Sequence, residues 1–174
     1  MTMVNEKVQA ALNKQLNAEL YASYIYLSMS AYFESANMAG MAGWMRVQAD
    51  EEEMHAMKIF DFIGDRGGRV TLAAIEAPPT EWKSPLAAFQ AAYEHEQKVT
   101  GLINDLVALA RKENDPATDI FLQWFVTEQV EEEKTADDIV QKLKMVQDQP
   151  GPLYMLDKEL GARKSAGESA GGEE

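Results

Sequence analysis

The chain has 174 residues, enough for one domain with a sizeable core, and its net charge is −13. A surface that binds nucleic acid needs the opposite charge, so cations are the more natural partners. Cysteine is absent, which excludes disulfides, thiolate zinc sites and cysteine nucleophiles. Residues 1–7 have no apolar signal-peptide core, and no apolar run approaches membrane-spanning length, so we expect a cytoplasmic protein with no membrane partner.

Apolar periodicity predicts a first long helix over residues 5–34, with Leu12, Leu16 and Tyr26 on one face. Glu19 lies on that same face. Burying an unpaired carboxylate is costly, so two interpretations are open: Glu19 reaches water at the edge of the stripe, or it faces a cation in the core.

A short break at residues 37–40 predicts that the next helix, over 41–64, returns antiparallel. This helix carries Glu52 and His55 on an otherwise apolar face. Their spacing of three puts both side chains one turn apart on the same side, where a carboxylate and an imidazole can hold one transition-metal ion. A Glu-x-x-His pair is also half of the ligand set of di-iron four-helix bundles.

Residues 69–84 contain two prolines and show no helical periodicity. An extended connection of this length spans roughly 50 Å, enough to cross a whole bundle, so the third helix should run parallel to the second. We expect a short strand-like stretch within it, at Val70, Leu72 and Ile75.

Ser84-Pro85 and Asp115-Pro116 are start signals for helices over 84–112 and 115–147. Glu96 interrupts the apolar stripe of the first, and Gln129 with Glu132 interrupts that of the second. A short amphipathic helix over 153–160 must pack on its own bundle or on a neighbouring subunit. We assign residues 1–161 to one domain and residues 162–174 to a disordered acidic tail.

Four helices thus place polar, metal-competent side chains in the middle of an apolar stripe. Buried carboxylates need compensation, and a metal centre provides it. The ligands are oxygen-rich with a single imidazole, which favours iron, with manganese or zinc as alternatives, over copper. The candidate ligands are Glu19, Glu52, His55, Glu96, Gln129 and Glu132.

The chain resembles the non-haem ferritins of bacteria and archaea. The resemblance rests on residues 17–21 (NAELY), 50–55 (DEEEMH), 93–97 (YEHEQ), 121–125 (FLQWF), 128–134 (EQVEEEK) and 156–160 (LDKEL). It implies an all-α, ferritin-like four-helix bundle with one long crossover loop and a short fifth helix at the C-terminal end.

The resemblance also implies a ferroxidase centre, in which Glu19, Glu52 and His55 hold a first iron and Glu52 bridges to a second. Glu96, Glu132 and Gln129 would hold that second iron, with Tyr26 as the nearby tyrosine. A third iron site beside the pair would use Glu51, Glu128, Glu131 and Glu132. Residues 131–133 also fit a solvated charge run.

Two departures from bacterioferritins, which share the expected fold, change the prediction. Those proteins carry a second Glu-x-x-His on the fourth helix, where this chain has Gln129 and Glu132, so the second iron should be held more weakly. Their haem ligand is a methionine directly after the bridging glutamate, and here that position is Glu53. We therefore expect no haem. His95, offset from Glu96 by about 100°, is predicted to lie at the surface or beside a ligand.

The bundle and metal site, taken with the resemblance, predict an iron-storage ferritin that oxidises Fe(II) with dioxygen and stores Fe(III) mineral. The resemblance alone implies that the mineral is kept in a hollow cage of 24 identical subunits. The alternatives are a stand-alone di-iron oxidase or oxygenase without mineral, a metal-free structural bundle, and a DNA-protecting mini-ferritin, which the charge suits poorly. We also consider a cation pore lined by Glu113, Asp115 and Asp119.

Overall fold

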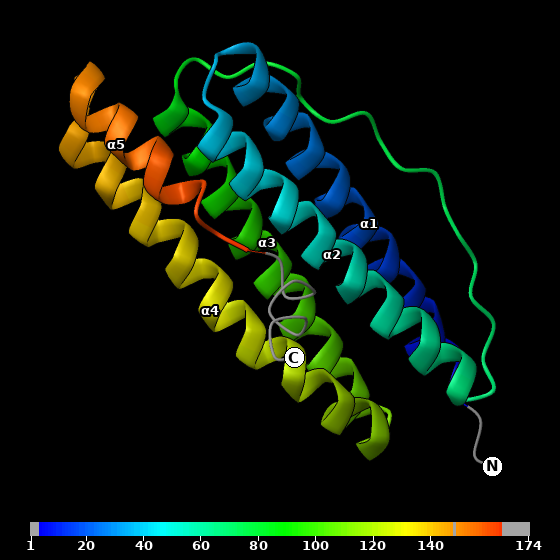
Figure 1. Cartoon of the computed structure of the whole chain (residues 1–174). Coiled ribbons are helices and arrows are strands. Elements are labelled where there is room, and N and C mark those ends of the chain that lie inside the picture. Colours follow the sequence, from blue (N-terminus) through cyan, green and yellow to red (C-terminus); the bar gives the residue numbers. More distant parts are fainter. Residues whose placement is uncertain (1–3, 148, 165–174) are drawn as a thin grey trace, which may run out of the picture.

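The computed structural model describes residues 4–147 and 149–164, and within them the regular secondary structure is entirely helical. Four long helices form a bundle, and a short fifth helix lies at one end, beside the second and fourth helices (Figure 1). None of the described helices is long and apolar enough to cross a membrane. The helices are α1 (Glu6–Ser35), α2 (Ala39–Asp65), α3 (Pro85–Lys112), α4 (Pro116–Val146) and α5 (Pro150–Leu160).

Local capping sets the starts of three helices. Asn5, Ser84 and Asp115 each accept a hydrogen bond from a backbone N–H in the first turn of α1, α3 and α4. The expected bounds of the four long helices are confirmed to within two residues. The expected start of the fifth helix at residue 153 is wrong, because α5 begins at Pro150, and proline is well suited to a first helical turn.

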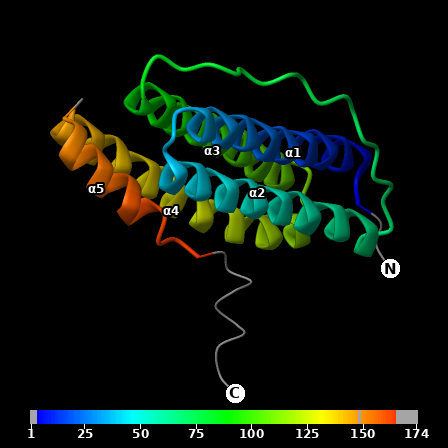
Figure 2. The same cartoon turned by 45° about the horizontal axis from the view of Figure 1, so that its top comes forward.

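The segment between α2 and α3 crosses the length of the bundle along the outer side of α1, so α3 runs parallel to α2 (Figures 1 and 2). Polar side chains of α1 hold it there. The Asn13 side chain makes two hydrogen bonds with the start of this segment. It donates to the Arg69 carbonyl (3.1 Å) and accepts from the Thr71 N–H (2.7 Å). The predicted strand-like stretch is wrong: no strand occurs in the described residues, and Leu72 is exposed.

The core consists of two apolar clusters. One lies at the α5 end and contains residues of 25–33, 41–49, 88–92, 139–143 and α5. The other contains residues of 4–16, 59–63, 99–110 and 122–125. The predicted ligand positions of all four long helices fall between these two sets. The bundle therefore has a polar layer in its middle, with apolar packing on either side.

The fifth helix docks on the start of α2, which has no side-chain cap of its own. The Asp157 carboxylate accepts hydrogen bonds from the N–H groups of Gly40 (3.2 Å) and Met41 (2.8 Å). A negative charge at this end of a helix also interacts favourably with its dipole. Position 40 admits only glycine, because a Cβ there would lie 1.7 Å from the Asp157 carbonyl oxygen. The fifth helix thus packs on its own bundle.

Candidate metal centre

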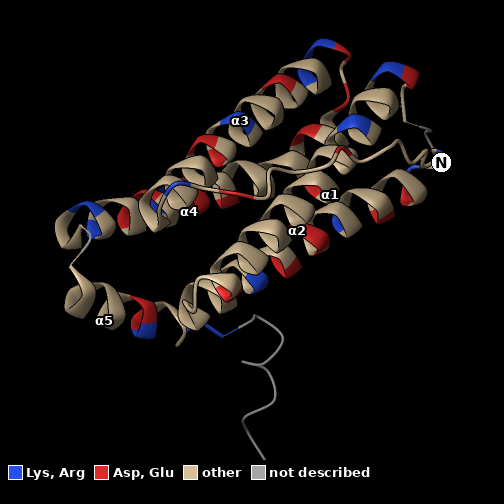
Figure 3. Ribbon diagram, turned by 90° about the horizontal axis from the view of Figure 1, so that it is seen from above, with Lys and Arg blue, Asp and Glu red and all other residues tan. Residues whose placement is uncertain are grey.

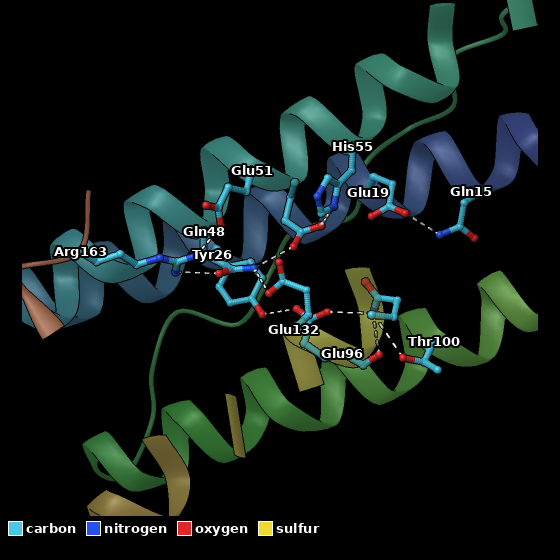
Figure 4. Close-up of polar contacts among 12 residues, drawn as sticks. Gln15, Glu19, Tyr26, Gln48, Glu51, His55, Glu96, Thr100, Glu132 and Arg163 are labelled. Carbon is cyan, nitrogen blue, oxygen red and sulfur yellow. Dashed lines mark hydrogen bonds and ion pairs between the residues drawn. The ribbon is translucent and has the colours of Figure 1, made fainter. Parts of the chain in front are cut away.

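The polar layer contains the six predicted ligands, and none of these residues is more than 8% exposed. They come from all four long helices. Figure 4 shows one labelled side chain from each helix directed toward the middle of the bundle: Glu19, His55, Glu96 and Glu132. Glu19 is 1% exposed, so the interpretation in which it reaches water is wrong. Helical spacing explains the arrangement, since each ligand continues the buried stripe of its own helix.

The ligand atoms form three overlapping groups, and within each group the atoms lie within 4.8 Å of one another. Glu52 belongs to two of these groups and Glu132 also belongs to two. His55 is likewise shared by two groups, so the three groups adjoin one another in the middle of the bundle. The groups are Glu19, Glu52 and His55; Glu52, Glu96 and Glu132; and His55, Glu128 and Glu132.

The carboxylates of the layer hold protons far more tightly than usual. Burial, together with the nearby charge of Glu52, raises the pKa of Glu19 to about 8. Burial and the charge of Glu96 raise the pKa of Glu132 to about 7. Burial is also the main cause of the raised pKa values of Glu52 and Glu96. No lysine or arginine in the described residues pairs with these four groups. A bound cation would supply the missing compensation.

An unpaired oxygen of Glu19 indicates that the layer fits a metal ion. The Glu19 Oε2 atom is buried and has no hydrogen-bond partner among the described residues. An unpaired buried acceptor is costly, and a cation would satisfy it. The other oxygen, Oε1, is held by the Gln15 amide (2.8 Å). His55 Nδ1 lies 3.3 Å from Glu52 Oε2, so the donors of this group converge as metal ligands require.

Two glutamines outside the predicted ligand set, Gln15 and Gln48, orient the carboxylates of the layer. Gln15 donates to Glu19, and Gln48 donates to Glu52 (3.1 Å) and to Glu132 (2.7 Å). Each glutamine lies four residues before the ligand of its own helix, one turn away on the same face. That repeated spacing is a signal from which the sequence could have revealed them. The amide donors leave the remaining carboxylate oxygens facing the centre.

Tyr26 and His95 lie together at one side of the layer. The Tyr26 hydroxyl donates a hydrogen bond to Glu96, which places this tyrosine beside the centre as expected. The His95 ring packs against Tyr21 (5.9 Å between centroids) and Tyr26 (6.3 Å). Its Nε2 is buried without a partner in the described residues, and burial lowers its pKa to about 4. His95 is therefore partly buried beside Tyr26 and is not a fully exposed surface residue.

Gln129 takes part in the centre as a hydrogen-bond donor. Its Nε2 lies 3.1 Å from Glu96 Oε2 and 3.3 Å from the Glu96 carbonyl oxygen. Thr100 accepts from the same amide and in turn donates to Glu133 (2.5 Å). The two sides of the layer therefore differ. Glu96 has the amide of Gln129 beside it, whereas Glu52 has the imidazole of His55.

The residues expected at a third iron site are only partly brought together. Glu128 and Glu132 share a group with His55. Glu131 is exposed and belongs to none of the groups found in the described residues. Glu51 is also outside those groups, and its carboxylate forms an ion pair with Arg163 (Figure 4).

The fold and the layer together define a class, the four-helix bundles that hold two metal ions between buried carboxylates. The Ferritin-like domain family matches residues 9–146. The bacterial non-heme ferritin of Bacteroides fragilis is 45% identical over 161 residues, covering 92% of this chain and all of that protein. An open pore ferritin from the archaeon Archaeoglobus fulgidus is 55% identical, with a TM-score of 0.93, covering 94% of this chain and 100% of that one. The chain therefore belongs to the ferritin-like domain family, as a non-haem ferritin of the bacterial and archaeal type.

Proposed function

We propose that this chain stores iron as a ferritin and that its buried carboxylate layer is a ferroxidase centre, with Fe(II) and dioxygen as substrates. One observation carries the proposal. Four buried carboxylates with raised pKa values converge in two ligand groups that share Glu52, and no lysine or arginine of the described residues pairs with them. The relatives named as non-heme ferritins support the same function.

The two positions have different ligands. Glu19, Glu52 and His55 would hold one Fe²⁺ ion, and Glu52, Glu96 and Glu132 the other. As iron binds, the protons held by the raised-pKa carboxyls leave, because a metal ligand must be deprotonated. Each Fe²⁺ then loses one electron, and the pair passes two electrons to dioxygen. Carboxylate oxygens are hard ligands, so they stabilise the Fe³⁺ product more than the reactant.

The oxidised iron must leave for the centre to work again. The third ligand group, with Glu128 and Glu132, lies next to the pair because it shares His55 and Glu132 with the other two groups. It would give oxidised ions a route out of the centre toward a mineral store. We propose that the store is the interior of a hollow cage of 24 identical chains, and that no haem is bound.

Aerobic loading with Fe²⁺, followed by gel filtration and an iron assay of each peak, tests this function. We expect iron far above the roughly two ions per chain of a dinuclear site, eluting with a very large particle. Iron stopping near two ions per chain on a small oligomer would favour a stand-alone di-iron oxidase. Absence of retained iron would favour a metal-free structural bundle.

A further inference from the structure

Arg163 lies beyond the end of α5, and its side chain reaches back across α2 (Figure 4). Its Nη1 donates to Gln48 Oε1 (2.8 Å), and its Nη2 pairs with Glu51. The guanidinium also lies over the Trp44 ring, 4.5 Å from the centroid. These three partners are spaced along one face of α2, so a single planar cation can contact all of them.

The packing of α5 fixes where Arg163 arrives. Asp157 binds the first N–H groups of α2, and Gly161 lies against Gly40. A Cβ on Gly161 would come within 2.9 Å of the Gly40 Cα, so the end of α5 is held directly beside α2. The side chains of Arg163 and Glu51 are only 23% and 20% exposed, so their ion pair is shielded from water.

Gln48 connects this cation to the metal centre. Its carbonyl oxygen accepts from Arg163, while its amide nitrogen donates to Glu52 and Glu132. Arg163 is therefore one side chain away from the bridging carboxylate. It also holds Glu51, the carboxylate that the ferritin resemblance places at a third iron site, and Glu51 stays outside the ligand groups of the described residues.

We propose that Arg163 is a positioning residue that competes with a metal cation for Glu51. The proposal rests on the proposed function, since it takes the neighbouring Glu128 and Glu132 as ligands of a third ion. A guanidinium and a metal ion cannot both use the same carboxylate at full strength, so Glu51 joins that ion only when Arg163 withdraws. By reciprocity, metal binding at Glu51 loosens the contact between the end of α5 and α2.

Anaerobic calorimetric titration with Zn²⁺, which does not change oxidation state, tests the competition on the assembled protein. In Arg163→Ala we expect the most weakly bound Zn²⁺ to bind about three- to tenfold more tightly, as removal of a shielded charged competitor predicts. Arg163→Lys should fall between the two, because lysine keeps the charge but lacks the fork that contacts both Gln48 and Glu51. The two tighter ions should change less than the weakest one, because Arg163 reaches their carboxylates only through Gln48.

Lys142→Ala is the matched control. It also removes one positive charge and one ion pair that involves α5, the pair with Glu159, but it has no contact with the metal centre. The affinity for the weakest ion should be unchanged. An equal gain in this variant would mean that net charge alone explains the effect, and would overturn the proposal.

Combination with Glu51→Gln separates local competition from a general loosening of the structure. When Glu51 can no longer ionise, Arg163→Ala should give no gain in affinity for the weakest ion. A gain that persists in the double variant would overturn the role of Arg163.

The titration also separates two kinds of failure. If the parental protein binds no tight pair of ions at all, the proposed function fails. If it binds the pair and Arg163→Ala leaves the affinity for the weakest ion unchanged, only the proposed competition fails.

Discussion

Two groups of acidic residues in this molecule have opposite electrostatic environments. In the middle of the bundle, the carboxylates of the metal centre have no lysine or arginine partner among the described residues. At the corner where α3 meets α4, Glu113, Asp115 and Asp119 each pair with a cation of the same chain, and acidic and basic residues lie together at these helix ends (Figure 3). The partners at this corner are Lys7, Arg66 and Arg111.

The pKa shifts follow this difference. Burial raises the pKa of Glu19 to about 8 in the centre. At the corner, burial raises the pKa of Asp115, but hydrogen bonds from Arg66 and Thr118 outweigh it and lower the pKa overall. A hydrogen bond from Arg111 likewise lowers the pKa of Asp119. Acidic residues that form ion pairs within the chain stabilise the fold, whereas buried acidic residues without a basic partner are available to bind a cation.

A cation pore lined by Glu113, Asp115 and Asp119 would first have to break three ion pairs.

The largest effect should come from the bridging ligand. Replacement of Glu52 by alanine removes a ligand from both metal positions, so we expect Fe(II) oxidation to slow by about 100-fold or more. Stopped-flow absorbance under air measures this rate. Asp119→Ala, an acidic residue of the corner, should oxidise iron at the parental rate. Oxidation at the parental rate in Glu52→Ala would show that Glu52 is not the bridge.

The corner should respond in the opposite way. Asp115 caps α4 and pairs with Arg66, so Asp115→Ala leaves a half-buried guanidinium unpaired and a helix uncapped. We expect the free energy of unfolding to fall by about 2 kcal/mol while the rate of iron oxidation stays the same. Chemical denaturation followed by circular dichroism measures the first quantity. Slower oxidation in a variant that remains folded would contradict the division between the two groups.

The raised pKa values in the centre predict how stability depends on pH. The pKa values of Glu19 and Glu132 are about 8 and about 7 in the folded state, against the ordinary glutamate value of 4.5 in the unfolded chain. Their contribution is therefore fully present below pH 4.5 and is lost as the pH rises through 7 and 8. Between pH 6 and 8.5 the metal-free protein should lose on the order of 4 kcal/mol, the larger part of it from Glu19. Thermal unfolding without metal and with saturating Zn²⁺ checks this, because Zn²⁺ should remove the loss.

The smallest effect is expected at the exposed edge of the corner. Arg111 pairs with Asp119 on the surface, where solvent weakens the interaction. Arg111→Ala should leave the midpoint of thermal unfolding unchanged within about 2 °C and the oxidation rate unaltered. A large loss of stability would mean that the corner is more tightly coupled than its exposure indicates.

The sequence predicts the four long helices well because their signals are local. Asn5, Ser84 and Asp115 cap helices whose apolar stripes repeat every three or four residues, and polar interruptions such as Glu19 and Glu96 mark the ligands. These signals depend only on spacing along one helix, so they need no knowledge of the partner helices.

The remaining features depend on contacts between distant parts of the chain. Arg163 reaches Glu51 only because Asp157 docks α5 on α2, and no periodicity reveals that contact. The surroundings of His95 also depend on contacts between helices, since its ring packs against two tyrosines on α1. Gln48 is a different case, because its position one turn before Glu52 was available from spacing alone.

The division of the core by its polar layer also bears on how cooperatively the chain unfolds. Each apolar cluster draws residues from all four long helices, so each half of the bundle has its own packing. Between them, the metal-free chain has buried acids in place of apolar contacts, so we expect its lowest local stability at mid-length. Ions bound there would act as cross-links between the four helices, joining two partly independent halves into one unfolding unit.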